Sequence, residues 1–264
     1  MKKEKIILFI PGYNCEKQII RVLNQIDKKV LKYIDEVIFI NNRSTDNTEK
    51  EVLKYKTSHK SLPLKILRNN DNYNLGGSHK VAFKYAIKNK FDYVIILHGD
   101  DQGSIKDLIP YIENGDYKKY DCLLGSRFIK GSKLVGYSKF RIFGNIVFNI
   151  IYSICIGKKI KDLGAGINMY STKILKNDFY HKFPDKLTFN CCMLFAHDYY
   201  KHNIKFFPIT WREDDQISNV KMFSQASITL KIALRYRISK KYVLNEFRDK
   251  IIDNYSAKEI KNNE

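Results

Sequence analysis

Residues 94–110 read VIILHGDDQGSIKDLIP, an apolar run that leads into a cluster of polar side chains. The apolar run predicts a buried strand, and the cluster predicts a turn immediately after it. Carboxylate and amide oxygens on such a turn suit Mg²⁺ or Mn²⁺, with water and substrate phosphates completing the coordination. We therefore expect Asp100 and Gln102 to bind a divalent metal. A plainer alternative is that Asp101 or Ser104 caps the next helix.

Short apolar runs alternate with amphipathic stretches over the first 125 residues, which is typical of βαβ units and of a mostly parallel sheet flanked by helices. We expect strands at residues 5–10, 35–40, 64–68, 93–97 and 121–126. We expect helices at residues 16–30, 46–59 and 77–89. In α/β sheets of this kind, ligands bind beyond the carboxyl ends of the strands. The polar segments of this chain lie at those ends, so the site should be assembled from loops.

The second half of the chain is less regular. Its expected elements are an apolar helix near residues 140–157, a turn at 162–166, a helix around 189–203 and a strand at 204–209. No Gly/Ser/Pro-rich stretch or internal repeat suggests a linker. We therefore assign residues 1–221 to one α/β domain and residues 222–264 to a C-terminal basic tail of amphipathic helices.

The net charge of +19, from 47 basic and 28 acidic residues, is the most unusual bulk property. Such an excess calls for a polyanionic partner, which is a nucleic acid, an anionic lipid surface or a phosphorylated substrate. We favour an anionic membrane surface, because the sequence contains no motif of a nucleic-acid-binding fold.

The cysteines and the N-terminal segment indicate where the protein works. The five cysteines form no CxxC pair and are odd in number, which suits reduced thiols in the cytoplasm. The N-terminal charges are followed by only a short apolar run before Pro11, unlike a secretory signal. We expect a cytoplasmic protein that is peripheral at the inner face of the membrane.

Six polar or glycine-containing segments follow one another along the chain: PGYNCEKQI (11–19), NNRSTDNT (41–48), NLGGSHKVAFKYAI (74–87), HGDDQ (98–102), GSRFIKG (125–131) and KDLGAGINMYS (161–171). In this order they resemble glycosyltransferase family 2, which has the GT-A fold, and within it the dolichyl- or polyprenyl-phosphate sugar synthases. One such motif is weak evidence, but six in the right order are strong. The resemblance spans residues 5–221. It implies an inverting enzyme that moves a sugar from a nucleotide-sugar donor to a polyprenyl-phosphate type of lipid.

The resemblance also implies a set of donor-binding residues. They are Pro11, Tyr13, Asn14, Glu16, Asn41, Asn42, Asp46, Gly76, His98, Arg212 and Lys221. Three of these positions depart from the family pattern. Asn41 and Asn42 replace a pair of Asp residues, and their amides can still read uracil through neutral hydrogen bonds. His98 replaces the first Asp of D-x-D-x-Q, either as a metal ligand that favours Mn²⁺ or, as we prefer, as a hydrogen-bonding partner of the donor ribose or sugar.

The acceptor side carries two arginines at positions where the polyprenyl-phosphate sugar synthases bind the acceptor phosphate. Arg127 and Arg141 are these residues, and with Asp100 they form the expected catalytic set. Two guanidinium groups suit one phosphate. Asn145 replaces a smaller residue and adds a possible hydrogen bond, and Asp162 lies in the D-x-x-x-G turn that lines the site. Alternatively, Arg127 pairs with an acidic neighbour and Arg141 is a solvated helix residue.

Two segments bear on membrane binding. Residues 142–157 would form a helix of about 24 Å at ~1.5 Å per residue, short of the ~30 Å hydrocarbon core. We expect this helix to lie in the membrane interface, although it equally fits the core of a soluble domain. Residues 228–242 combine an apolar face with five basic residues, which an anionic leaflet attracts. A packing helix with a solvated face is the alternative.

The nature of the acceptor decides whether a general base is needed. A lipid phosphate is already anionic, whereas a sugar hydroxyl on a cell-surface polysaccharide or lipopolysaccharide must lose a proton. Four carboxylates of the second half are candidate bases: Asp162, Asp185, Asp198 and Glu213. Outside this enzyme class, a basic nucleic-acid-binding module is a less favoured alternative. A dinucleotide-dependent oxidoreductase is disfavoured, because the first strand leads into PGYNCE and not G-x-G-x-x-G.

Overall fold

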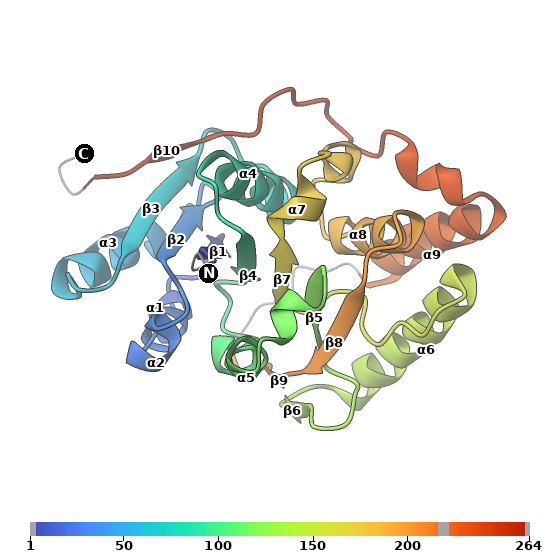
Figure 1. Ribbon diagram of the computed structural model, residues 1–264, viewed down its shortest axis with the longest axis horizontal. Helices are drawn as coiled ribbons and strands as arrows, with labels where there is room; N and C mark the ends of the chain where they lie inside the picture. The colour runs from blue at the N-terminus through green and yellow to red at the C-terminus, as the bar shows by residue number, and fades with distance from the viewer. Residues whose placement is uncertain (1–3, 216–221, 262–264) are drawn as a thin grey trace.

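A central sheet organises the computed structural model, which describes residues 4–215 and 222–261 (Figure 1). Within these residues the sheet has eight strands in the order β10-β3-β2-β1-β4-β7-β5-β8. The strands are β1 Ile6–Gly12, β2 Glu36–Asn41, β3 Leu64–Asn69, β4 Tyr93–Leu97, β5 Cys122–Ser126, β7 Ile167–Ser171, β8 Ile204–Pro208 and β10 Ala257–Glu259. Two further strands, β6 Lys133–Val135 and β9 Thr210–Arg212, pair with each other beside the sheet.

The strands of the first half run parallel, as the sequence predicts. β1 pairs in parallel with β2 and β4, and β2 pairs in parallel with β3. β7 is antiparallel to both β4 and β5, and β8 is parallel to β5. The prediction of a mostly parallel sheet is therefore confirmed. The central strands read as continuous apolar runs because helices cover both of their faces.

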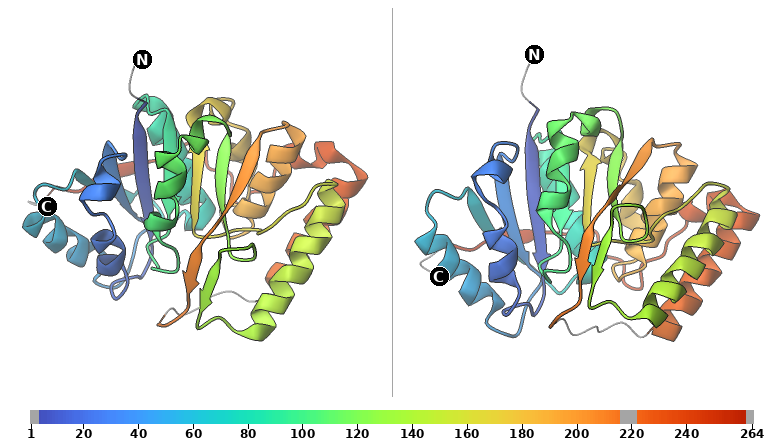
Figure 2. Two further views of the ribbon diagram at one scale, coloured as in Figure 1. Left: turned by 60° about the horizontal axis from the view of Figure 1, so that its bottom comes forward. Right: turned by 90° about the horizontal axis from the view of Figure 1, so that it is seen from below.

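Helices flank the sheet on both sides (Figure 2). The α-helices are α1 Ile19–Asn24, α2 Lys28–Leu31, α3 Thr48–Ser58, α4 Asn74–Lys88, α5 Ile109–Glu113, α6 Lys139–Ile156, α7 Thr172–Leu175, α8 Phe189–Tyr199 and α9 Met222–Ile238. Short 3₁₀ helices are η1 Ile105–Asp107, η2 Asp116–Lys118, η3 Phe179–Lys182 and η4 Lys240–Leu244. Buried apolar side chains form one cluster under α4, α8 and α9 and a second under α1, α3 and α5.

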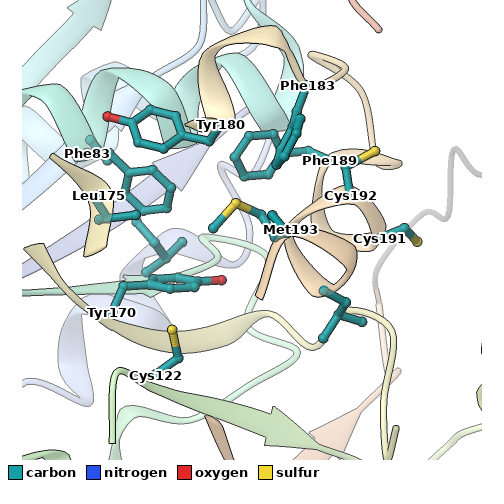
Figure 3. Packing of buried hydrophobic residues seen from close by; sticks show 14 of the residues in the cluster. Phe83, Cys122, Tyr170, Leu175, Tyr180, Phe183, Phe189, Cys191, Cys192 and Met193 are labelled. Carbon is teal, nitrogen blue, oxygen red and sulfur yellow. The ribbon is translucent and has the colours of Figure 1, made fainter. Parts of the chain in front are cut away.

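Aromatic rings fill the first of these clusters (Figure 3). The ring centroid of Phe83 lies 5.2 Å from that of Tyr170 and 5.0 Å from that of Tyr180, both edge to face. Edge-to-face contacts add to the free energy gained from burying the ring surfaces. They join α4 to β7 and to the segment before α8.

The single helix predicted for residues 16–30 is wrong, because the structure divides it into α1 and α2. The break falls at Asp27, whose side chain accepts hydrogen bonds from the backbone N–H groups of Lys29 and Val30. An Asp in extended conformation at this position caps a new helix start. The turn between the two helices follows from that cap.

The C-terminal segment is helical only in part. After α9 and η4, residues Ala257–Glu259 form β10, which pairs antiparallel with β3. A bare edge strand exposes unpaired backbone groups, and β10 covers those of β3. Just before β10, the buried hydroxyl of Tyr255 donates to Asp185, and the buried ammonium of Lys80 contacts the same carboxylate at 2.7 Å. Desolvation by burial lowers the pKa of Lys80 to about 8.

We expect Tyr255→Phe to lower the free energy of unfolding by about 1–3 kcal/mol, the cost of leaving buried polar partners unsatisfied. Urea denaturation of the full chain measures this change. The control is Tyr33→Phe, which removes a solvent-exposed hydrogen bond to Glu113 and should leave stability unchanged. Equal stability of both variants would show that the Tyr255 network does not hold the C-terminal segment.

Candidate active site

The candidate site lies at the carboxyl ends of β1, β2 and β4. The parallel register places Gly12 of β1 opposite Asn41 of β2 and Phe9 of β1 opposite Ile96 of β4. The turn after β4 lies against β1, because the Gly99 N–H donates to the Pro11 carbonyl at 3.0 Å. The three polar turns predicted to meet therefore do so.

The first and second loops are tied together by the residues expected to hold the donor. The side chain of Asn14 accepts from the Thr45 N–H at 2.8 Å, and that of Glu16 accepts from the Asn47 N–H at 2.9 Å. Asp46 accepts from the Glu16 N–H at 3.2 Å. Pro11 is buried in β1, whereas Tyr13 is 45% exposed. Tyr13 and its neighbour Asn14 are both exposed, so this loop reaches solvent through these two side chains.

Asn41 and Asn42 are buried and bonded within the protein. Asn41 donates to Glu49 at 2.6 Å and accepts from the Ser44 N–H at 2.8 Å. Asn42 donates to Asn72 at 2.8 Å and accepts from Asn69. These contacts give a physical reason for the departure from Asp: a carboxylate at position 41 would face the Glu49 carboxylate and have no proton to donate.

Gly76 allows a close approach at the start of α4. Its N–H donates to the Asp185 carbonyl at 2.6 Å. A Cβ at this position would lie 2.4 Å from the Pro184 carbonyl oxygen and 2.7 Å from the Cβ of Phe189. Any larger residue would push α4 away from this loop.

The two carboxylates after β4 have different surroundings. Asp101 is buried, has a φ of 58°, and accepts from Arg21 at 2.7 Å and from Gln25 at 3.0 Å, so it joins the turn to α1. Asp100 accepts from the Gln102 N–H at 3.1 Å, and burial raises the pKa of its carboxyl. The capping alternative holds for Ser104, which accepts from the Lys106 N–H ahead of η1, but not for Asp101.

The donor set at this turn fits a divalent metal that shares its coordination with substrate. Among the described residues, no group of three or more His, Cys, Asp or Glu is placed to hold a metal. Asp100 offers carboxylate oxygens, and Gln102 uses its Nε2 to donate to Glu213 at 3.3 Å, which leaves Oε1 as its ligand atom. One or two protein oxygens plus phosphates and water are how Mg²⁺ is usually held. A dication here would offset the burial that disfavours the charged form of Asp100.

His98 is half-buried and has one buried, unsatisfied ring nitrogen. Its backbone N–H donates to Gly166 at 2.8 Å, and its Nε2 is buried without a hydrogen-bond partner. Its ring centroid lies 5.6 Å from that of His79, whose two ring nitrogens are likewise buried without partners. Burial lowers the pKa of both imidazoles, which favours their neutral forms. His79 was not predicted as a site residue, because its contact with His98 joins α4 to the turn after β4 and depends on how the helix packs.

Arg127 is paired with Asp162, which is the alternative that the sequence left open. Asp162 accepts from Nε of Arg127 at 2.8 Å, from Nη2 at 2.7 Å and from the backbone N–H at 2.9 Å. The guanidinium also lies 4.8 Å from the Trp211 ring and donates to the Tyr137 hydroxyl at 3.3 Å. This cluster is buried, and Asp162 balances the charge of Arg127 within it.

Arg141 is also paired, so it is not a solvated helix residue. Its Nη1 donates to Glu213 at 2.5 Å, and its guanidinium lies 5.1 Å from the ring of Tyr137. Asn145 donates to the Tyr137 hydroxyl at 2.8 Å. Tyr137 thus lies between the two arginines. The sequence did not single it out, since its contacts depend on how α6 packs.

The segment after β9 reaches the same site. The Arg212 N–H donates to the Gln102 carbonyl at 3.0 Å, while its side chain is 48% exposed and lies 3.9 Å from Asp214. Lys221, the other cation expected here, lies outside the described residues. Of the four candidate bases, Glu213 contacts the turn after β4, whereas Asp185 and Asp198 accept from lysine and tyrosine side chains in buried networks.

We expect Asp162→Asn to destabilise the protein by about 3–5 kcal/mol, because it leaves the buried Arg127 charge uncompensated. Urea denaturation compares it with Asp249→Asn, which removes the exposed pair with Lys186. The control should be indistinguishable from the wild type. A loss of stability as small as that of the control would mean that the Arg127 charge is neutralised by other groups.

Relatives by sequence identify the family. The sequence profile of glycosyl transferase family 2 matches residues 7–179. A dolichyl-phosphate beta-glucosyltransferase of Dictyostelium discoideum is 24% identical over 261 residues, which cover 92% of this chain and 76% of that protein. An uncharacterized protein of Methanocaldococcus jannaschii is 24% identical over 176 residues, or 67% of this chain and 68% of that protein.

Solved structures share the fold. S. aureus TarS 1-349 in complex with UDP-GlcNAc has a TM-score of 0.55 at 21% identity, over 92% of this chain and 71% of that chain. Mannosyltransferase PcManGT from Pyrobaculum calidifontis, in complex with GDP-Man and Mn²⁺, has a TM-score of 0.57 at 14% identity, over 92% of this chain and 72% of that chain.

The chain therefore belongs to glycosyl transferase family 2 and has the GT-A fold. It is a nucleotide-sugar glycosyltransferase, which confirms the resemblance seen in its motifs. This class removes the alternative of a non-catalytic nucleic-acid-binding module.

Proposed function

We propose that this glycosyltransferase moves a sugar, with inversion, onto the phosphate of a polyprenyl-phosphate type of lipid. The observation that carries the proposal is the pair of guanidinium groups around Tyr137. Arg127 donates to its hydroxyl and Arg141 lies against its ring, next to the turn that bears Asp100. Arginine forks suit phosphate oxygens. The name of the Dictyostelium relative, a dolichyl-phosphate beta-glucosyltransferase, supports the same acceptor class.

The donor is a nucleotide sugar held by the loops after β1, β2 and β4. Tyr13 is exposed at the first loop, and Asn41 and Asn42 lie at the end of β2. The buried Nε2 of His98 needs a hydrogen-bond partner, which a hydroxyl of the donor ribose or sugar would supply. The complexes of TarS with UDP-GlcNAc and of PcManGT with GDP-Man support a nucleotide-sugar donor.

Asp100 and Gln102 would hold Mn²⁺ or Mg²⁺. When bound, the ion neutralises charge that develops on the departing nucleotide diphosphate. Mn²⁺ in the PcManGT complex supports this cofactor class.

The reaction breaks one C–O bond and forms another. An anionic oxygen of the lipid phosphate attacks the anomeric carbon from the face opposite the diphosphate, and the electron pair of the broken C–O bond leaves with the nucleotide. Because this oxygen carries no proton near neutral pH, no general base is needed. Arg141 orients the acceptor phosphate, while Arg127, held by Asp162, keeps the Tyr137 hydroxyl in place.

A second candidate acceptor is a sugar hydroxyl of a cell-surface polysaccharide or lipopolysaccharide. Glu213 favours this alternative, because it is a carboxylate beside Gln102 and so within the site. The two acceptors differ in their products, since one is a sugar phosphodiester and the other a glycoside.

One face of α6 suits an anionic membrane surface. Its exposed large apolar side chains are Phe140, Phe143, Ile146, Ile150 and Ile154. The helix runs along the end of the molecule beside α9, as Figure 2 shows.

Among the described residues, α6 alone is long and apolar enough to cross a membrane, and 22% of it is buried inside the protein. Exposed basic side chains of Lys158, Lys159, Lys231, Arg235 and Arg237 flank it. We propose that α6 lies in the membrane interface with these cations at the headgroups.

We expect Asp100→Ala to lower metal-dependent nucleotide release by about 10²–10³-fold, the scale of losing one main electrostatic contact to the transition state. The assay supplies UDP-, GDP-, CDP- and dTDP-sugars, with Mn²⁺ or Mg²⁺ and a short polyprenyl phosphate. Lys50→Ala, on the exposed side of α3, is the control and should retain wild-type rates. Full activity of Asp100→Ala would exclude Asp100 from the site.

We expect the double change Phe143→Ser and Ile154→Ser to abolish sedimentation with anionic vesicles at low salt. Each of these side chains is 66% exposed, so folding should be unaffected. Ile251→Ser is the matched control, since Ile251 is 69% exposed but lies outside α6 and α9. Unchanged sedimentation of the α6 variant would overturn the assignment of this face.

A further inference from the structure

Glu213 joins the two halves of the candidate site. Its Oε2 accepts from Nη1 of Arg141 at 2.5 Å, and its Oε1 accepts from Nε2 of Gln102 at 3.3 Å. These partners lie 72 and 111 residues away in the sequence. One carboxylate therefore touches both the arginine expected to bind the acceptor phosphate and the amide expected to bind the metal.

The backbone holds Glu213 in this position. β9 ends at Arg212, and the Glu213 N–H donates to the Val135 carbonyl at 2.9 Å, which extends the pairing of β9 with β6. The Glu213 side chain is only 15% exposed. A change of side-chain rotamer is enough to move the carboxylate away from Arg141 while this backbone pairing stays in place.

Arg127 and Arg141 differ in how tightly each is bound to its carboxylate partner. Asp162 accepts from two guanidinium nitrogens of Arg127, and that arginine is 9% exposed. Glu213 accepts from Nη1 of Arg141, which is 27% exposed. An anion from solvent meets less competition at Arg141, because that pair is more hydrated and has fewer hydrogen bonds to replace.

We propose that Glu213 occupies the acceptor-phosphate position on Arg141 and is displaced when the phosphate arrives. The inference rests on the proposed function, since it takes the acceptor to be a phosphate. A carboxylate and a phosphate bind a guanidinium through the same N–H donors, so they compete for it. A phosphate monoester with up to two negative charges displaces one carboxylate, whereas a neutral hydroxyl brings no charge to do so. Glu213 is then a specificity-determining residue that selects strongly anionic acceptors.

Binding to the full chain tests the proposal, with a short-chain polyprenyl monophosphate as probe and the polyprenol of the same length as the uncharged comparison. Glu213→Gln removes the competing charge but keeps the shape, so we expect it to bind the phosphate roughly tenfold more tightly, as expected for releasing a charge-assisted contact. Asp214→Asn is the matched control: it makes the same change in net charge one residue away, and we expect less than a twofold effect. Glu213→Ala should act in the same direction as Glu213→Gln.

A double variant isolates the contact. In an Arg141→Gln background, Glu213→Gln should give no gain in affinity, because the arginine it competes for is absent. Equal or weaker phosphate binding by Glu213→Gln than by Asp214→Asn overturns the role of Glu213. In that event, phosphate binding by the wild type without polyprenol binding would still support the lipid-phosphate acceptor. Failure of both the wild type and Glu213→Gln to bind the phosphate would overturn both proposals.

Discussion

The parallel pairing of β1 with β2 on one side and β4 on the other is the constraint on which the site depends. β1 is buried along its whole length, and the register places its last residue, Gly12, opposite Asn41. A slip of one residue would exchange the two faces of the strand, which the buried apolar side chains forbid. The turns after these three strands must therefore open at the same edge. The loops after β1 and β2 and the turn after β4 are neighbours because the core fixes the register.

The ion pairs of Arg127 and Arg141 are a second constraint on the candidate site. The protein has a net charge of +19, yet Arg127 and Arg141 are each paired with a carboxylate. The Asp162 pair is buried and stabilises the loop after β5, whereas the Glu213 pair is more exposed and joins α6 to the turn after β4. Buried charges must be compensated where they lie, whereas cations at the surface are solvated and need no partner within the protein. Some basic residues thus form ion pairs within the candidate site, and others lie on the surface around it.

Features that depend on a local sequence pattern could be predicted from the sequence. Apolar runs indicated the strands of the first half, and the motifs in order indicated the family and the turns that form the site. Contacts between distant residues could not be predicted: Arg127 with Asp162 spans 35 residues, and Arg141 with Glu213 spans 72. β10 could not be predicted either, because it pairs with β3, a strand far away in the sequence whose edge the rest of the sheet leaves open. Asn41 stands where the family motif has Asp, and its hydrogen bond to the Glu49 carboxylate gives the physical reason for the amide.

The most direct measurement is the identity of the product made by the purified full chain from a nucleotide sugar, a divalent metal and a short polyprenyl phosphate. Mass spectrometry identifies the sugar phosphodiester, and NMR gives the configuration at its anomeric carbon. We expect a polyprenyl-phosphate sugar whose anomeric configuration is inverted relative to the donor. A glycoside formed only on a glycan hydroxyl, or a phosphodiester with retained configuration, would contradict the proposed reaction.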